Sequence, residues 1–121
     1  MNMRILSYEY LQWQIRQLSS LVEELDPHNF HRLLKAMNEV EELTEDLLEV
    51  LAFSGNKHTA SYEAAFEAGE KRTALAALLE YPSDYEELEL GVIHLQKAIC
   101  KLARVLQAKL AVAFPFSLVP A

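Results

Sequence analysis

The densest group of side chains that could do chemistry is an acidic block at residues 39–49. Its carboxylates belong to Glu39, Glu41, Glu42, Glu45, Asp46 and Glu49, and no lysine or arginine occurs from residue 36 to residue 56. Divalent cations such as Mg²⁺ prefer several oxygen ligands, and the spacing of Glu39 and Glu42 places them on one face of a helix. The block therefore indicates either a Mg²⁺ site or a solvated helix face. The solvated face is favoured, because Glu42 lies far round the helix from the apolar positions.

Residues 33–45 resemble the first metal-binding helix of the MazG-like all-α nucleoside triphosphate pyrophosphohydrolases. That family carries an E-E-x-x-E motif on this helix, often shortly after an aromatic–histidine pair such as Phe30-His31. The resemblance implies that Glu39 and Glu42 bind Mg²⁺ for cleavage between the α and β phosphates of a nucleoside triphosphate. Asn38 stands where the family has its first glutamate.

The second motif of that family, E-x-x-D on a later helix, has its best counterpart at residues 86–90. Under this resemblance the further Mg²⁺ ligands would be Glu86, Glu87 and Glu89. If Glu87 is the glutamate of the motif, Leu90 occupies the aspartate position; if Glu86 is, Glu89 does. Glu86 also has a structural interpretation, because Ser83 and Glu86 match a capping box at the start of a helix.

A second candidate site is His94. The run from His94 to Ala98 resembles the H-x-x-K-G core of histidine phosphotransfer domains, which are also acidic four-helix bundles of this size. The resemblance implies that His94 accepts a phosphoryl group and that Lys97 helps to neutralise it. Ala98 replaces the glycine of that family. The alternative is a histidine at a contact between helices or subunits.

The other reactive residue types give no catalytic set. Cys100 is the only cysteine, which excludes an internal disulfide and a cysteine-rich zinc site, and we expect a buried thiol in a reducing compartment. The three glycines, Gly55, Gly69 and Gly91, are isolated, so no glycine-rich phosphate loop exists. Outside the two resemblances we assign no catalytic residue, and we expect no cofactor other than Mg²⁺ under the hydrolase alternative.

The elements that must position these residues are four helices. Apolar periodicity and turn signals predict them at about 7–25, 27–53, 59–81 and 84–113. The first has an apolar stripe at Leu11, Ile15, Leu18, Val22 and Leu25, and the last has one at Leu88, Val92, Leu95, Ile99, Leu102, Leu106 and Leu110. The third is rich in alanine, which predicts a thin helix packed closely against a neighbour. We expect Asp26-Pro27 to begin the second helix and Ser54-Gly55-Asn56 to end it.

Short turns between these segments predict a single all-α domain, an antiparallel four-helix bundle followed by an apolar, non-helical tail at 114–121. Several residues outside the apolar stripes are predicted to form an interface. They are Tyr10 and Trp13 on the first helix, Gly91, Ala98, Val105 and Val112 on a second stripe of the fourth, and Phe114 and Phe116 in the tail. We expect another protein, including a second copy in a homodimer, to cover them.

Composition limits the function. The chain has 121 residues, 51% of them hydrophobic, and a net charge of −7, which disfavours nucleic-acid binding. The most apolar stretch, at 110–119, is too short to cross a membrane and no signal peptide is visible, so we expect a cytoplasmic protein. The leading hypothesis is a small acidic bundle that acts through protein–protein interaction, as inhibitor, immunity or chaperone proteins do, with its acidic face steering a basic partner.

Overall fold

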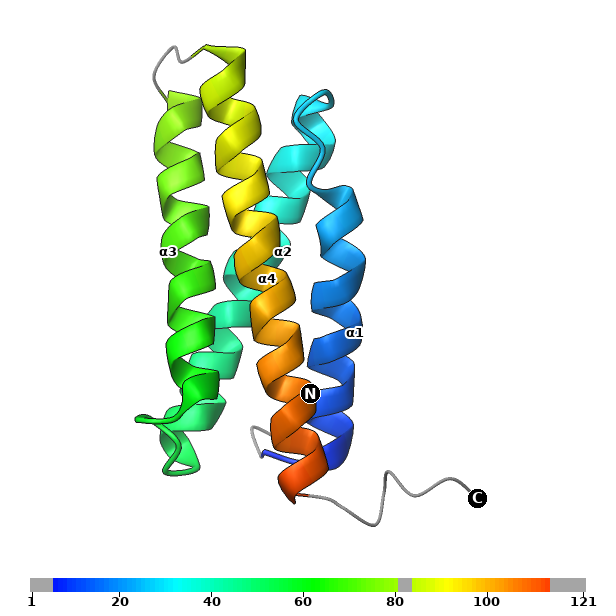
Figure 1. Ribbon diagram of the computed structural model, residues 1–121, viewed down its shortest axis with the longest axis vertical. Coiled ribbons are helices and arrows are strands. Elements are labelled where there is room, and N and C mark those ends of the chain that lie inside the picture. The colour runs from blue at the N-terminus through cyan, green and yellow to red at the C-terminus, as the bar shows by residue number, and fades with distance from the viewer. Residues whose placement is uncertain (1–5, 81–83, 114–121) are drawn as a thin grey trace.

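The computed structural model describes residues 6–80 and 84–113. Four helices occur in this part of the chain: α1 (Tyr8–Glu24), α2 (Phe30–Phe53), α3 (Ala60–Glu80) and α4 (Tyr85–Ala113). Consecutive helices run antiparallel, and α1 also packs on α4, so that α2 and α4 lie on opposite sides of the bundle (Figure 1). The prediction of an all-α four-helix bundle is confirmed. The predicted tail, with Phe114 and Phe116, lies outside the described residues.

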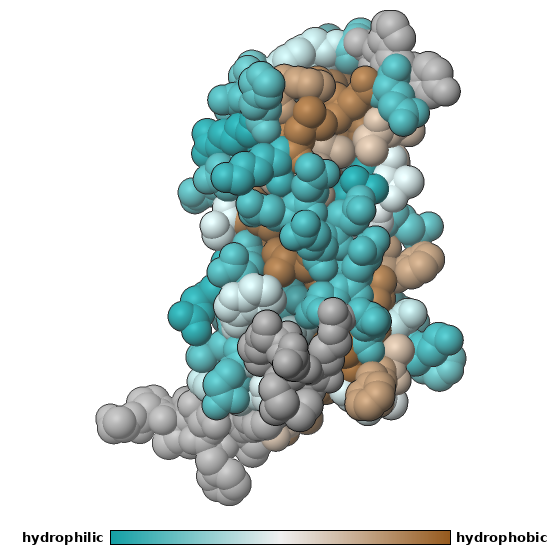
Figure 2. All heavy atoms as spheres, turned by 180° about the vertical axis from the view of Figure 1, so that it is seen from behind, coloured by the Kyte–Doolittle hydropathy of each residue, from teal (hydrophilic) through white to brown (hydrophobic). Residues whose placement is uncertain are grey.

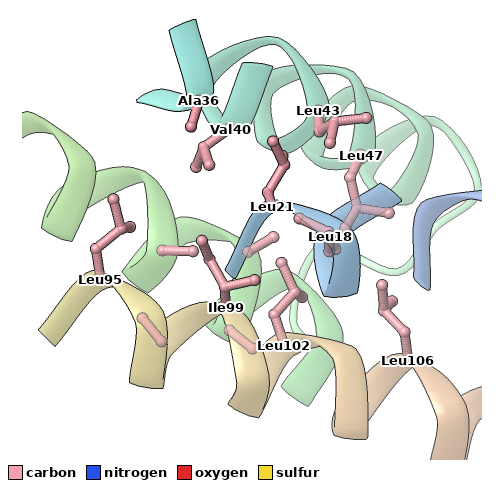
Figure 3. Packing of buried hydrophobic residues seen from close by; sticks show 14 of the residues in the cluster. Leu18, Leu21, Ala36, Val40, Leu43, Leu47, Leu95, Ile99, Leu102 and Leu106 are labelled. Atoms are coloured by element: carbon pink, nitrogen blue, oxygen red, sulfur yellow. The ribbon is translucent and has the colours of Figure 1, made fainter. Parts of the chain in front are cut away.

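The apolar stripes of the four helices meet in one core (Figure 3). On α4 the buried positions are those of the predicted stripe from Val92 to Leu110, together with Ala98, which was predicted on the second stripe. On α1 the buried stripe is Leu11, Gln14, Leu18, Leu21 and Leu25, with alternating steps of three and four residues. Ile15 and Val22, which were predicted on this stripe, are only half-buried against the core.

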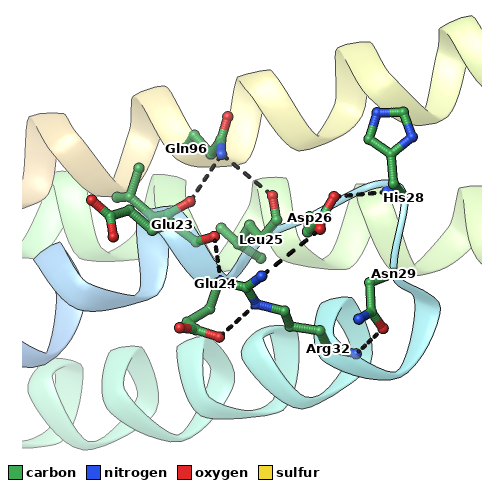
Figure 4. Close-up of polar contacts among 9 residues, drawn as sticks. Glu23, Glu24, Leu25, Asp26, His28, Asn29, Arg32 and Gln96 are labelled. Atoms are coloured by element: carbon green, nitrogen blue, oxygen red, sulfur yellow. Dashed lines mark hydrogen bonds and ion pairs between the residues drawn. The ribbon is translucent and has the colours of Figure 1, made fainter.

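The predicted start of α2 at Asp26-Pro27 is wrong. The helix begins at Phe30, and its N-cap is Asn29, whose Oδ1 accepts a hydrogen bond of 3.1 Å from the backbone N–H of Arg32. Asp26 caps a separate turn, because its Oδ1 accepts a hydrogen bond of 2.9 Å from the backbone N–H of His28 (Figure 4). Two capping residues in succession compete for the helix start, and the one next to the periodic segment prevails.

An ion pair across this turn gives a pH-dependent stabilisation. The Nε of Arg32 donates a hydrogen bond of 2.8 Å to Oε2 of Glu24, and this contact holds the pKa of Glu24 below its ordinary value. A lowered pKa means that the stabilisation is complete above the ordinary glutamate pKa, about 4.3, and is lost as the pH falls through the lowered value.

We therefore expect Arg32→Gln to melt at a lower temperature than the wild type near neutral pH, and the difference to disappear in acid. Thermal unfolding of both proteins across this pH range measures the difference, and NMR titration of Glu24 gives its pKa. Because both side chains are about half exposed, the effect is small. Equal pKa values of Glu24 in the two proteins would contradict the assignment.

The other helix ends show which turn signals hold. After α2, Asn56 N–H donates to the carbonyl of Leu51 at 2.7 Å, and Gly55 N–H donates to that of Ala52 at 3.2 Å. Gly55 has φ of +76°, so the predicted glycine C-cap is confirmed. The predicted capping box before α4 involves Ser83, which lies outside the described residues. Asp84 supplies a cap there, since its Oδ1 accepts a hydrogen bond of 2.8 Å from the backbone N–H of Glu87.

The alanine-rich helix α3 is thin, as predicted, and its buried face consists of small residues. Ala64, Ala65, Ala68, Ser61 and one large residue, Leu75, are buried. On the facing helix, a Cβ added to Gly91 would lie 3.0 Å from Cδ1 of Leu78 and 3.1 Å from Cδ1 of Leu75. The absence of a side chain at Gly91 therefore leaves room on α4 for Leu75 and Leu78 of α3.

The two helical glycines should respond differently to alanine. Gly69→Ala is expected to raise the free energy of unfolding by about 1 kcal/mol, because alanine is the better helix former and the nearest side-chain atom is 3.9 Å away. Gly91→Ala has the same gain in helix propensity, but the new methyl group must displace two leucine side chains. We therefore expect the free energy of unfolding of Gly91→Ala to be lower than that of Gly69→Ala by at least about 1 kcal/mol. Urea denaturation of both variants makes the comparison. Equal stabilisation of the two variants would mean that Leu75 and Leu78 of α3 can move away from a new methyl group without a loss of stability.

Candidate functional site

Charge is segregated between the two opposite helices α2 and α4. After Glu89 the remainder of α4 carries Lys97, Lys101, Arg104 and Lys109 and contains no aspartate or glutamate. The acidic block lies on α2, on the other side of the bundle. Figure 2 shows the bundle from the side opposite to that of Figure 1, where α2 lies; hydrophilic residues cover most of this side, and an apolar area lies near its upper end. An acidic chain thus presents one basic side, along α4.

A hollow of about 1090 Å³ follows the outward side of α4. Its lining includes the half-buried Ile15 and Val22 from α1 and the exposed Ile93, Lys97 and Arg104 from α4. Apolar side chains and cations therefore alternate along one strip of the surface, within reach of the same ligand.

Polar contacts fix α4 relative to its two neighbours. The Nε2 of Gln96 donates to the carbonyls of Val22 at 2.9 Å and Leu25 at 3.4 Å, at the C-terminal end of α1 (Figure 4). On the other flank, Nζ of Lys101 forms an ion pair of 3.1 Å with Oε2 of Glu67 on α3. A backbone carbonyl cannot move without its helix, so the Gln96 contacts hold the side of α4 that lines the hollow in register with α1.

Two cations of α4 are not used inside the bundle. Lys97 and Arg104 form no ion pair with any of the described residues, whereas Lys101 pairs with Glu67. Lys109 donates a hydrogen bond of 2.8 Å to Oδ1 of Asn56. Lys97 and Arg104 are therefore the cations of this side that an external acidic group would meet first.

His94 also lies at the hollow. It is exposed, with Lys97 and Lys101 beside it on α4 and Lys71 on α3, while Ala98 behind it is buried. The phosphotransfer alternative requires an exposed imidazole next to cations and small residues. That arrangement is present on the surface of α4.

Cys100 was predicted to be a buried thiol, and this prediction is wrong. The side chain is exposed and lines the hollow. Cys100 follows Ile99, which is fully buried. A rotation of about 100° per residue turns the next side chain out of the core. This position gives the protein a single thiol at the centre of its basic side.

The two groups of proposed Mg²⁺ ligands are not brought together. Glu39 and Glu42 lie on α2, whereas Glu86, Glu87 and Glu89 lie in the first turns of α4, and these two helices make no contact. Within residues 6–80 and 84–113, no group of three or more histidine, cysteine, aspartate or glutamate side chains could hold a metal ion. Antiparallel four-helix packing places the two helices diagonally, so the two motifs face different sides of the bundle.

Apart from Tyr10, the residues predicted to form an interface fall into three sets. Trp13 and Val112 are exposed, by 45% and 83% of their surface. Gly91 lies against α3 of the same chain, Ala98 is buried, and Val105 is half-buried. The small-residue stripe of α4 is therefore explained, at least at Gly91, by an intramolecular neighbour. Phe114 and Phe116 lie outside the described residues.

Tyr10 was predicted to be an exposed aromatic, and it is instead 93% buried. Its hydroxyl donates a hydrogen bond of 2.6 Å to Oδ2 of Asp46 and accepts one of 2.9 Å from Nε2 of Gln14. Nε2 of Gln14 also donates to the carbonyl of Leu43 at 3.2 Å. Sequence reasoning missed this polar chain between α1 and α2, although Gln14 lies three residues after Leu11 on the buried stripe.

The burial of Gln14 is expected to lower the free energy of unfolding, and this expectation can be tested. It is fully buried, and its Oε1 has no hydrogen-bond partner among the described residues. Gln14→Met keeps the length of the side chain and removes the unpaired oxygen, so we expect the free energy of unfolding to rise by about 1 kcal/mol. Gln14→Ala, which leaves a cavity, should instead lose about 2 kcal/mol. Chemical denaturation checks both, and a loss of stability in Gln14→Met would show that the hydrogen bonds from Nε2 to Tyr10 and Leu43 outweigh the cost of the unpaired oxygen.

None of the described helices is long and apolar enough to cross a membrane. Comparison of the chain with family models, with curated proteins and with solved structures finds no match.

Proposed function

We propose that this protein is a cytoplasmic interaction module that binds an acidic protein partner through the outward side of α4. The observation that carries the proposal is the presence of exposed apolar side chains and unpaired cations on one strip of a chain whose net charge is −7. Leu90 and Ile93 expose 53% and 40% of their surface, and Lys97 and Arg104 lie next to them along the helix. An apolar centre with a charged rim is the usual composition of a protein-binding surface.

The acidic block on α2 has a complementary role in this proposal. It faces away from α4, so it repels an acidic partner from the wrong side of the bundle while the basic side attracts it. This differs from the expectation that the acidic side itself binds a basic partner. The preference for α4 comes from Leu90 and Ile93, which are exposed on the helix that carries the unpaired cations, whereas the exposed apolar side chain beside the acidic block, Phe66, belongs to α3.

The exposed Cys100 allows a direct test, because it is the only cysteine and lies in the proposed binding surface. A benzophenone attached to its thiol should crosslink a discrete partner in an extract of the source cells. Lys97→Glu/Arg104→Glu should abolish that product. Lys35→Glu/Lys57→Glu, a matched control with two exposed cations on the other parts of the bundle, should retain it. Each variant replaces two cations by two carboxylates, so the net charge changes equally.

Two results would overturn the proposal. One is the same crosslinked product in both charge-reversal variants, and the other is the absence of any specific product with the wild type. Far-ultraviolet circular dichroism of all three proteins confirms that the bundle is intact in each.

A second candidate function, histidine phosphotransfer, is favoured by the exposure of His94 in the same hollow as Lys97, Lys101 and Lys71. In that reaction an imidazole nitrogen attacks phosphorus, a P–N bond forms, and the leaving group departs with a proton. The neighbouring cations would balance the charge of the phosphoryl group.

Phosphoramidate as donor tests this function, with ammonia as the leaving group. We expect a phosphohistidine signal from His94 in ³¹P NMR of the wild type that forms faster than any signal from the exposed His28, His31 and His58, that is lost with His94→Gln, and that forms more slowly with Lys97→Gln. Lys57→Gln is the control for a lost surface cation. A wild-type protein that acquires no phosphohistidine excludes the phosphotransfer function.

A further inference from the structure

The hollow beside α4 contains a groove with a distinct floor and rim. Ile15 and Val22 of α1 are half-buried and form the floor together with Ala103 of α4. Ile93 and Cys100 of α4 are exposed at the edge of this floor, about two helical turns apart. Along this edge the exposed side chains of Ile93 and Cys100 therefore alternate with those of Lys97 and Arg104.

The charges around this groove are unequal on its two sides. Lys97 and Arg104 lie on the α4 side, and Glu23 lies on the α1 side. The other charged pair at the hollow, Lys101 with Glu67, is neutralised internally by its ion pair. A ligand that fits must therefore place its acidic groups next to α4.

The size of the groove fits one helix. Its lining runs along α4 from Ile93 to Gln107. At a rise of 1.5 Å per residue this is about 21 Å, or about four helical turns. A helix that lies along two parallel neighbours and contributes a side chain to the floor at every turn is a recurring mode of peptide recognition.

The charges argue against a second copy of α4 in the register that is centred on this groove. A symmetric antiparallel pairing of α4 about a point between Cys100 and Lys101 would place Lys97 of each copy opposite Arg104 of the other. Because the pairing is symmetric, this repulsion between two cations would occur at two places in the interface. The occupant must therefore bring negative charge to this edge.

We infer that the groove between α1 and α4 receives an amphipathic helix of a partner protein, with its apolar stripe on Ile15, Val22 and Ile93 and with acidic residues facing Lys97 and Arg104. This inference rests on the proposed function and specifies its partner.

A designed helical peptide of about 20 residues tests the inference. Its leucines form one stripe, with glutamates along one edge of that stripe; the control peptide has lysine at each glutamate position. With the unmodified full-length protein, the glutamate peptide should slow the reaction of the Cys100 thiol with a disulfide reagent and shift the NMR signals of Ile15, Val22 and Ile93. We expect it to bind at least tenfold more tightly than the lysine peptide.

Two variants locate the binding. Lys97→Glu/Arg104→Glu should reverse the preference, so that the lysine peptide binds more tightly. Ile93→Asp should abolish binding, whereas Phe66→Asp, which changes an exposed aromatic of α3 outside this groove, should leave it unchanged. Both are surface substitutions, and thermal melting verifies that each variant folds.

Equal affinity for the two peptides, or no binding of either, would overturn the inference. So would protection of Cys100 by a higher concentration of the protein alone, because that result assigns the groove to a second copy. If the peptides fail while the Cys100 crosslink to a cellular partner persists, the helical occupant is wrong and the proposed function stands. If the crosslink is absent as well, both are wrong.

Discussion

Replacement of Ala68 by leucine should lower the free energy of unfolding by about 3 kcal/mol. Ala68 has no exposed surface, and Ala64 and Ala65 on the same face of α3 are buried as well. A packed interior has no space for three additional carbon atoms, so the larger side chain must leave its preferred rotamer or separate the helices. The effect is large because α3 packs closely on both α2 and α4.

Ala77→Leu is the matched control for this prediction. It makes the same substitution on the same helix, but Ala77 is exposed, so the change should remain within about 0.5 kcal/mol. Urea denaturation of the two variants, with the slope of the transition compared as well as its midpoint, separates a loss of stability from a change in the unfolded state. A value for Ala68→Leu as small as that of Ala77→Leu would show that α3 is not tightly packed.

Leu102→Ala should destabilise the protein by about 3 kcal/mol. Leu102 is fully buried on the main stripe of α4 and lies in the cluster that joins all four helices (Figure 3). Truncation removes buried methyl groups and leaves a cavity that the rigid neighbours fill only in part. Thermal unfolding should show a midpoint lower by many degrees, since a domain of this size shifts by about 4 °C or more per kcal/mol.

Leu90→Ala removes the same atoms from the exposed part of the same helix. Leu90 has 53% of its surface exposed, so the loss of stability should stay below about 0.5 kcal/mol. The comparison also bears on function, since a surface residue that contributes to binding can be removed without unfolding the bundle. If both variants lost the same stability, α4 would be buried on two sides in the isolated protein.

The bundle itself could be predicted from local patterns. A stripe such as Val92, Leu95, Ile99 and Leu102 repeats with the period of an α-helix, and such a helix is stable only if other helices cover that stripe. The C-cap at Gly55 could be predicted for the same reason, because a left-handed backbone at this position depends on the local sequence alone. These features need no knowledge of which helices become neighbours.

The site could be predicted only in part. The sequence placed His94 and Lys97 outside the buried stripe of α4, where the structure exposes them, whereas Cys100, which was expected to be buried, is exposed, and the glutamates that the hydrolase resemblance pairs lie on helices that make no contact. Apolar periodicity predicts the direction in which each side chain points around the axis of its own helix. It does not predict which neighbouring helix lies in that direction. Tyr10 illustrates this limit, since its hydroxyl is satisfied by Asp46 of α2, a contact between residues far apart in the sequence.

The four helices, their antiparallel order and the segregation of acidic and basic residues along the chain follow from local sequence patterns alone. Helix packing places α2 and α4 diagonally, which separates the two glutamate groups. The packed structure also leaves Lys97 and Arg104 without an ion pair among the described residues and exposes Cys100. The physical reason is that helix formation depends on interactions a few residues apart, whereas a binding surface is made of side chains from different helices. Their relative positions follow from how the large and small residues of the whole core pack together.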